Sequence, residues 1–193
     1  MVTEEQTALN QKTYLALGRF VVCFSHLLNS LEESTIWLFG IALDGKRRIL
    51  VKAALSGRTA SPIVSSFFTV FFEKWGNLIT EQDLTIIKCL RKEIEDLIQI
   101  RNRIMHDAWM GKSVGGDPGP HPMGTFRVRT HGKGATYDII EFEPEKVTSI
   151  ADDAERLAKI ITGIVFYHKP GDEGPAVADR FEIREKRVYK KEA

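Results

Sequence analysis

The sequence predicts an all-α protein: a bundle of four to five helices with a small β-hairpin inserted before the last long helix. Three observations predict this class. Apolar residues recur at steps of three and four over several long stretches, which is the spacing of one face of an α-helix. One stretch instead alternates between apolar and polar residues around a glycine-containing turn, as β-hairpins do. At 193 residues, with 43% hydrophobic and 27% charged residues, the chain has the composition of a soluble globular protein.

The first expected helix runs from about residue 7 to residue 42. Its apolar positions are Leu17, Phe20, Phe24, Leu27, Leu31 and Leu38. Polar residues, among them Glu32 and Glu33, interrupt its most apolar part, which argues against a membrane span. The polar, acidic start of the chain does not resemble a signal peptide. We therefore expect a cytoplasmic protein without a membrane partner.

Shorter helices follow. One is expected over residues 47–55, and the next begins with Ser61 as N-cap and Pro62 as the first helical residue. Thr80 with Asp83 three residues later resembles a capping box, with Asp in the position where Glu is usual. This pair predicts the start of the helix with the clearest pattern in the chain.

That helix carries one charged residue in its apolar seam. The seam consists of Ile87, Leu90, Ile94, Leu97, Arg101, Ile104 and Ala108. An unpaired buried guanidinium is strongly unfavourable, so Arg101 needs an anionic partner or an open cleft. Glu93, Glu95, Asp96 or an acid on the first helix are the candidates for an internal partner.

The remaining elements are a hairpin, a last helix and a tail. The hairpin is expected at about residues 124–142, and Pro144 opens the last long helix. Residues 1–168 are expected to form the helical domain and residues 169–193 a charged tail. The segment from residue 180 to the end carries six Lys or Arg against three Glu, so we expect a frayed helix or a mobile strand there.

Three residues near the end of the seam helix suit phosphate chemistry. Asn102 and His106 are four residues apart and share a helix face, while Arg101 lies on the flank of His106. A guanidinium can fork onto phosphate oxygens. An imidazole, which ordinarily titrates near about pH 6.5, can accept or donate a proton. The set therefore indicates a site for a phosphate-like group.

An Arg, a polar residue and then a His near the end of a long helix in an all-α bundle resemble the motif of the HEPN superfamily. Arg101, Asn102 and His106 match this motif one for one, and the resemblance covers about residues 7–168. It implies metal-independent RNA cleavage at a composite site across a homodimer two-fold axis, without a cofactor. We hypothesise that this cleavage leaves a 2′,3′-cyclic phosphate. The setting that the resemblance implies is a bacterial toxin or phage-defence effector.

One branch of HEPN toxins is silenced by a partner nucleotidyltransferase and carries a Tyr two residues after the motif His. This chain has Ala108 at that position, so the resemblance names no antitoxin or regulatory partner.

The alternative hypothesis is a non-catalytic HEPN-like dimeric module that binds a nucleotide, nucleic acid or a protein partner. In that case Arg101 is neutralised internally and His106 acts as a helix C-terminal cap. Other candidates for RNA contact are Arg103, Lys112, Arg127, Arg129 and Lys133. The hairpin arginines share one face, which is alternatively a solvated outer face. No cysteine pair or Cys/His cluster has metal-ligand spacing, so no metal site is predicted.

Overall fold

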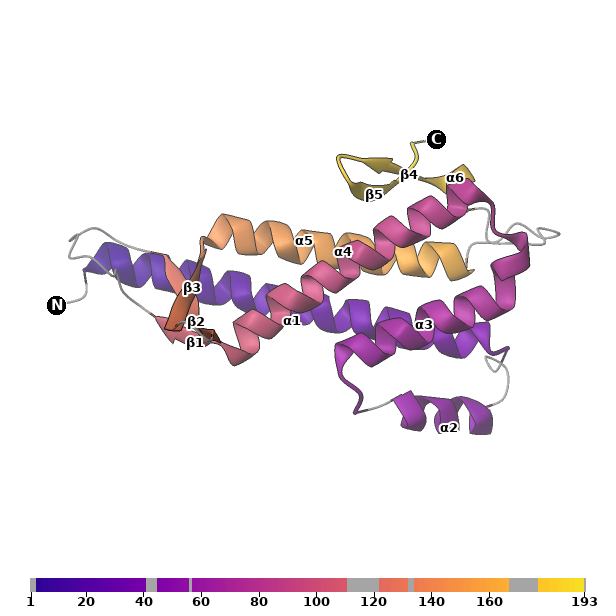
Figure 1. Ribbon diagram of the computed structural model, residues 1–193, viewed down its shortest axis with the longest axis horizontal. Helices are drawn as coiled ribbons and strands as arrows, with labels where there is room; N and C mark the ends of the chain where they lie inside the picture. The colour runs from indigo at the N-terminus through magenta and orange to yellow at the C-terminus, as the bar shows by residue number, and fades with distance from the viewer. Residues whose placement is uncertain are drawn as a thin grey trace. The chain divides into compact units, whose positions relative to one another are not determined.

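The computed structural model describes residues 3–40, 45–55, 57–110, 122–131, 134–166 and 177–192 (Figure 1). These residues form six α-helices, one 3₁₀ turn and five short strands. The prediction of a mostly helical chain with a hairpin before the last long helix is confirmed.

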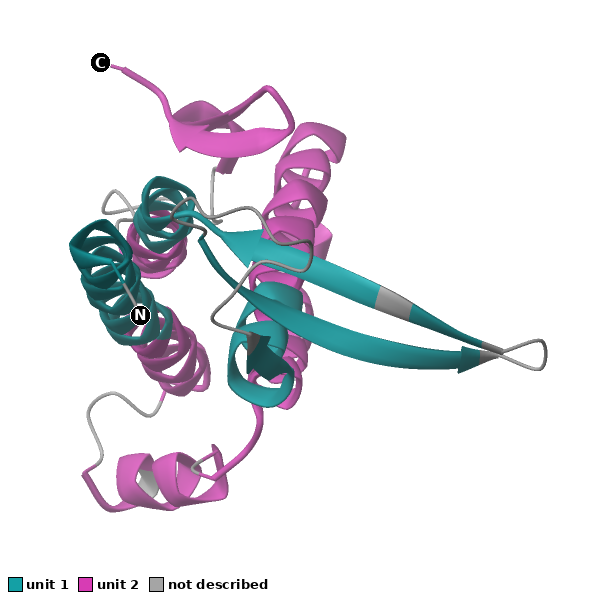
Figure 2. Cartoon of the chain, turned by 90° about the vertical axis from the view of Figure 1, so that its left-hand side faces the viewer, with its two compact units in different colours: residues 1–24, 99–153 teal, residues 25–98, 154–193 magenta. Residues whose placement is uncertain are grey.

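The chain divides into two compact units (Figure 2). Unit 1 comprises residues 1–24 and 99–153, and unit 2 comprises residues 25–98 and 154–193. The three long helices α1 (Glu4–Leu38), α4 (Glu81–His106) and α5 (Pro144–Phe166) each begin in one unit and end in the other.

Unit 1 contains a three-stranded antiparallel sheet of order β1-β2-β3. The strands are β1 (Ala108–Met110), β2 (Met123–His131) and β3 (Gly134–Phe142). The predicted hairpin is confirmed, and it extends away from the helical segments of its unit (Figure 2). Beyond its base both faces are open, because Val128 is as exposed as the arginines that alternate with it.

The end of α4 differs from the prediction. The helix ends at His106, and Ala108 begins β1 instead of continuing the seam. The indole N–H of Trp109 donates to the carbonyl oxygen of Ile104 at 2.9 Å and so satisfies an acceptor of the last helical turn. The Trp109 ring packs on Phe142 at 5.5 Å between centroids, which fixes the first strand beside the helix end.

Unit 2 is mainly helical and has an aromatic core. It adds α2 (Gly45–Leu55), α3 (Ala60–Trp75) and η1 (Gly76–Leu78) to its parts of the long helices. Its largest fully buried side chains include Phe67, Phe68 and Phe71 of α3. These apolar residues of α3 therefore face the interior of the unit.

The two predicted helix starts in unit 2 have different outcomes. The capping box is confirmed: the Thr80 hydroxyl oxygen accepts from the Asp83 backbone N–H at 3.1 Å, and the Asp83 carboxylate accepts from the Thr80 N–H at 3.0 Å. The Ser61 cap is wrong, since α3 begins at Ala60 with Thr59 in the N-cap position and no side-chain cap bond. Pro62 still falls within the first turn, where its missing N–H costs no helical hydrogen bond.

The C-terminal segment is ordered, contrary to the prediction of a frayed helix or mobile strand. It forms α6 (Val177–Arg180) and a hairpin of β4 (Phe181–Arg184) and β5 (Arg187–Lys190). Val188 is fully buried. Its N–H donates to the Glu93 carboxylate at 2.7 Å, and its carbonyl oxygen accepts from Arg156. Side chains of α4 and α5 thus hold the backbone of a segment that is highly charged in sequence.

By length and composition alone, α1 is the one helix among the described residues that could cross a membrane. The core helix of a soluble protein passes the same test, so this finding does not distinguish the two cases.

Candidate active site

The last turns of α4 bring the three predicted catalytic residues together. The Nη1 atom of Arg101 lies 3.2 Å from the side-chain oxygen of Asn102 and 3.4 Å from Nε2 of His106. His106 is exposed to solvent, while Arg101 and Asn102 are half-buried. A cation, an amide and an imidazole therefore meet at one accessible point of unit 1.

The predicted internal partners of Arg101 on its own helix are engaged elsewhere. Glu93 pairs with Arg156. Glu95 pairs with Arg91 at 2.8 Å, and Asp96 pairs with Lys92 at 2.6 Å. Within the described ranges, no carboxylate pairs with Arg101.

Arg101 also does not remain buried in the seam, where the spacing places it. Its side chain is half-buried and its guanidinium reaches residues one and five positions further along the helix. The long aliphatic stem allows this, because it can lie along apolar surface while the charged group reaches solvent.

A network of ion pairs joins the end of α4 to the hairpin. Arg103 donates from Nε to Asp107 at 3.1 Å and from Nη1 to Asp138 at 2.9 Å. Its Nη2 also donates to the backbone oxygen of Asp138. The Asp107 side chain is 3% exposed and that of Arg103 is 13% exposed, so these charges are well shielded from water.

The hairpin arginines complete this network. Arg127 donates from Nε and Nη2 to the same oxygen of Asp107, at 2.8 and 2.5 Å. Arg129 donates to Asp138 at 2.9 Å. The network of Arg103, Asp107, Arg127, Arg129 and Asp138 therefore holds three cations on two carboxylates, and it fixes the strands to the residue that follows His106.

This geometry gives Arg103, Arg127 and Arg129 structural partners that the sequence analysis did not assign. Arg103 is largely shielded, so its predicted contact with RNA would require it to leave two aspartates. Arg127 and Arg129 keep about half of their side-chain surface exposed, and RNA contact by them remains a prediction. Lys112 and Lys133 lie outside the described residues.

Sequence reasoning missed Asp107 and Asp138. One signal was present, because Arg103 and Asp107 are four residues apart, the spacing at which helical ion pairs form. The register that pairs Arg127 with Asp138 across the hairpin could also have placed an acid beside the arginines.

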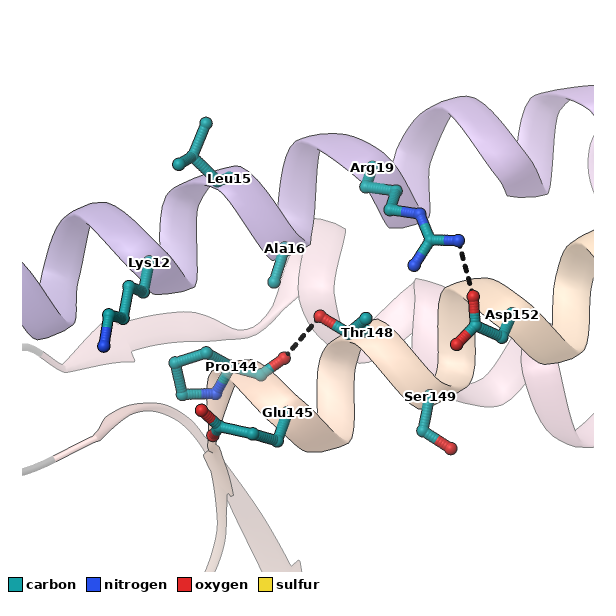
Figure 3. Close-up of a pocket in the computed structure, with 9 residues that line it drawn as sticks. All are labelled: Lys12, Leu15, Ala16, Arg19, Pro144, Glu145, Thr148, Ser149 and Asp152. Atoms are coloured by element: carbon teal, nitrogen blue, oxygen red, sulfur yellow. Dashed lines mark hydrogen bonds and ion pairs between the residues drawn. The ribbon is translucent and has the colours of Figure 1, made fainter.

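Unit 1 also contains a cleft that the sequence analysis did not predict (Figure 3). It has a volume of about 540 Å³ and lies between α1 and the start of α5. The Arg19 and Asp152 side chains form an ion pair at 2.5 Å across it, and Lys12 stands at one end (Figure 3). Arg101, Asn102 and His106 do not line this cleft.

The residue types in the α4 cluster suit proton transfer and anion binding more than metal binding. Among the described residues, no group of three His, Cys, Asp or Glu side chains is placed to hold a metal ion. Asn102 is a neutral donor and acceptor, and Arg101 is a permanent cation. A comparison with protein-family models, curated proteins and solved structures finds no match to this chain.

Proposed function

We propose that this protein is a metal-independent endoribonuclease of the HEPN type that acts as a homodimer. The observation that supports it is the contact of Arg101 with Asn102 and His106 at 3.2 and 3.4 Å. Within the described ranges this guanidinium has no carboxylate partner, so its charge is available to a phosphate.

The proposed reaction is transesterification within the RNA backbone. The ribose 2′-oxygen attacks the adjacent phosphorus and loses its proton to an imidazole, while the 5′-oxygen leaves and takes up a proton. The products are a 2′,3′-cyclic phosphate and a 5′-hydroxyl. Arg101 stabilises the negative charge that builds on the phosphate oxygens, and Asn102 orients the phosphate or the imidazole.

A homodimer suits this reaction because it needs a base and an acid. One chain supplies one His106, and a two-fold axis beside the cluster would supply the second. Size-exclusion chromatography with light scattering tests this directly: we expect twice the mass of the 21.8 kDa chain. A monomeric mass at the concentration used for cleavage assays would contradict the homodimer.

The activity is tested by incubating mixed RNA with the purified protein in EDTA. We expect the wild type to cleave RNA. His106→Ala should cleave at least about 100-fold more slowly, because this is the usual contribution of a general acid or base. Arg101→Ala should lose a similar factor. Arg91→Ala is the matched control, since Arg91 is an exposed arginine of the same helix in a surface ion pair.

Two outcomes would contradict the proposal. One is RNA that stays equally intact with wild type and His106→Ala. The other is cleavage that all variants perform at the same rate, which would indicate a contaminant. Wild-type protein that binds RNA or a nucleotide without cleaving RNA would instead support the non-catalytic module. The proposal includes a role in the cytoplasm as a toxin or phage-defence effector. This role predicts that expression of the protein arrests bacterial growth only when His106 is intact.

A further inference from the structure

Strand β3 forms one edge of the sheet in unit 1. The strand order β1-β2-β3 places β2 on one side of β3 and, among the described residues, no strand on the other side. In an antiparallel ladder every second residue turns its N–H and C=O groups away from the paired strand. The nine residues of β3 therefore present a row of such groups along the outer side of the hairpin (Figure 2).

This edge lacks the devices that commonly protect an edge strand from further pairing. Proteins often protect an edge with a proline, a lysine or a β-bulge. The sequence of β3, GATYDIIEF, contains neither proline nor lysine. Its register with β2 runs one residue to one residue along the whole strand, so no bulge bends the edge away. The edge therefore has the long, regular backbone that the addition of a strand requires.

A cavity of about 560 Å³ lies beside the last residues of β3. The strand contributes Ile139, Ile140 and Glu141 to its lining, while Glu143 precedes α5 and Lys146 belongs to the first turn of that helix. All five residues belong to unit 1. Ile139 is 47% exposed, so an apolar contact is available next to the backbone of the edge. The cavity gives space to the side chains of a segment that pairs with β3.

The free charges beside this edge are mainly acidic. Glu141 and Glu143 are exposed, and neither carboxylate has a hydrogen-bond or ion-pair partner in the part of the chain that the structure describes. These two carboxylates outnumber Lys146, the one cation of the lining. Ile139, Glu141 and Glu143 are two residues apart, so they follow the alternation of one strand face. A strand added here should carry an apolar side chain opposite Ile139 and basic side chains opposite the two glutamates.

The same charges select among the possible occupants of the edge. A second copy of β3 is disfavoured, because Asp138, Glu141 and Glu143 would meet an identical set of acids with no lysine or arginine on the strand to compensate them. A nucleic-acid backbone or an anionic membrane would be repelled by the glutamates. An extended basic segment of another protein satisfies the backbone groups, the exposed isoleucine and both carboxylates.

We propose that the outer edge of β3 binds an extended basic segment of a partner protein by strand addition. Basic side chains of that segment pair with Glu141 and Glu143, and an apolar one contacts Ile139. This inference goes beyond the proposed nuclease activity and does not depend on it. It gives a chemical class to the protein partner that the resemblance leaves unnamed.

The test uses the full chain and a fluorescently labelled peptide of sequence KTKTVTV. In antiparallel register this peptide places its lysines opposite Glu143 and Glu141 and a valine opposite Ile139. Fluorescence anisotropy measures its dissociation constant. We expect binding of KTKTVTV and much weaker binding of ETETVTV, which has the same length and apolar residues but the opposite charge. KTKTVTV with methylated backbone nitrogens should not bind, because it lacks the N–H donors that strand addition uses.

Substitutions test whether the two glutamates hold the peptide. Glu141→Gln together with Glu143→Gln should weaken binding about fivefold, because two exposed ion pairs are lost. Glu4→Gln together with Glu5→Gln is the matched control, since these exposed acids of α1 lie in the same unit and do not line the cavity. The control should bind the peptide as the wild type does, and circular dichroism checks that each variant keeps its helix content.

Amide hydrogen exchange, measured residue by residue by NMR, locates the bound peptide. The outward amides of β3 should exchange rapidly in the free protein and slowly once the peptide is added. No binding of KTKTVTV at about 1 mM, equal binding of ETETVTV, or an equal loss in the control variant would each overturn the proposal. Outward amides already protected in the free protein would also overturn it, because another part of this chain then occupies the edge. Protection that increases with protein concentration would instead identify a second copy as the occupant and would equally overturn it.

Discussion

The network that joins α4 to the hairpin gives the sharpest prediction for stability. In Asp107→Asn the carboxylate loses its charge, and one acceptor position becomes an N–H donor that faces a guanidinium. Asp107 accepts three hydrogen bonds, one from Arg103 and two from Arg127, and its side chain is 3% exposed. The substitution therefore leaves two arginines without their shared anion.

The size of the effect follows from how shielded each partner is. Breaking a fully buried ion pair costs about 3–5 kcal/mol. Arg127 is 42% exposed, so water offsets part of its loss, and Arg103 keeps Asp138 as a second partner. We therefore expect Asp107→Asn to destabilise unit 1 by roughly 2 kcal/mol.

Amide hydrogen exchange in β2 and β3 measures this locally, which matters because the two units need not unfold together. A loss of about 2 kcal/mol corresponds to exchange about 30-fold faster in these strands. The control is Asp152→Asn, because Asp152 forms an ion pair with Arg19 in which both side chains are exposed. This substitution should destabilise unit 1 by less than about 1 kcal/mol. If the two variants accelerate exchange equally, shielding does not determine the strength of this network and the reasoning fails.

Three further predictions concern backbone and caps. Gly124→Ala should destabilise unit 1 by roughly 2 kcal/mol or more, because the added Cβ would lie 2.8 Å from the backbone oxygen of Ile140. Gly18→Ala should instead stabilise the protein by up to about 1 kcal/mol, since nothing lies within 4 Å of its added Cβ. Urea denaturation distinguishes the two signs. Thr80→Ala should cost about 1 kcal/mol in the same assay, through loss of the α4 cap. Burial would raise the pKa of Asp83, but hydrogen bonds, the first of them from Thr80, outweigh it and hold that pKa below its ordinary value of 3.8. The stabilisation that the ionised Asp83 side chain provides is therefore present above about pH 4 and is lost as the pH falls through the lower folded-state pKa. Asp83→Asn should be less stable than wild type at pH 7, and this difference in the free energy of unfolding should narrow in strong acid.

The long helices and the β2–β3 hairpin were predictable because their signals are local. Seam residues such as Leu90 and Ile94 are fully buried, as their three- and four-residue spacing predicts. Thr80 and Asp83 form their capping box within a single turn, so both partners of its hydrogen bonds can be recognised from a four-residue stretch of sequence. The motif residues also meet within one and a half turns of a single helix, which is why their clustering could be anticipated.

The elements that were missed depend on distant partners. β5 is held by Glu93 and Arg156, which lie 95 and 32 residues away from Val188 in sequence. The charged composition of that segment conceals this, because the groups that are bound belong to its backbone. β1 spans three residues, too few to show an alternating pattern.

Arg101 and Arg103 are two residues apart on α4 and therefore point to nearly opposite sides of the helix. Arg103 is neutralised by two aspartates, so the fold supplies carboxylates where this helix end needs them. On the other side, Arg101 contacts a neutral amide and an imidazole within the described part of the chain. The partial negative charge of the helix C-terminus favours cations there, but it gives no reason to converge an amide and an imidazole on the same guanidinium nitrogen. An anion that accepts hydrogen bonds from all three side chains would give such a reason, and this difference between two neighbouring arginines is the physical argument for a ligand site at the end of α4.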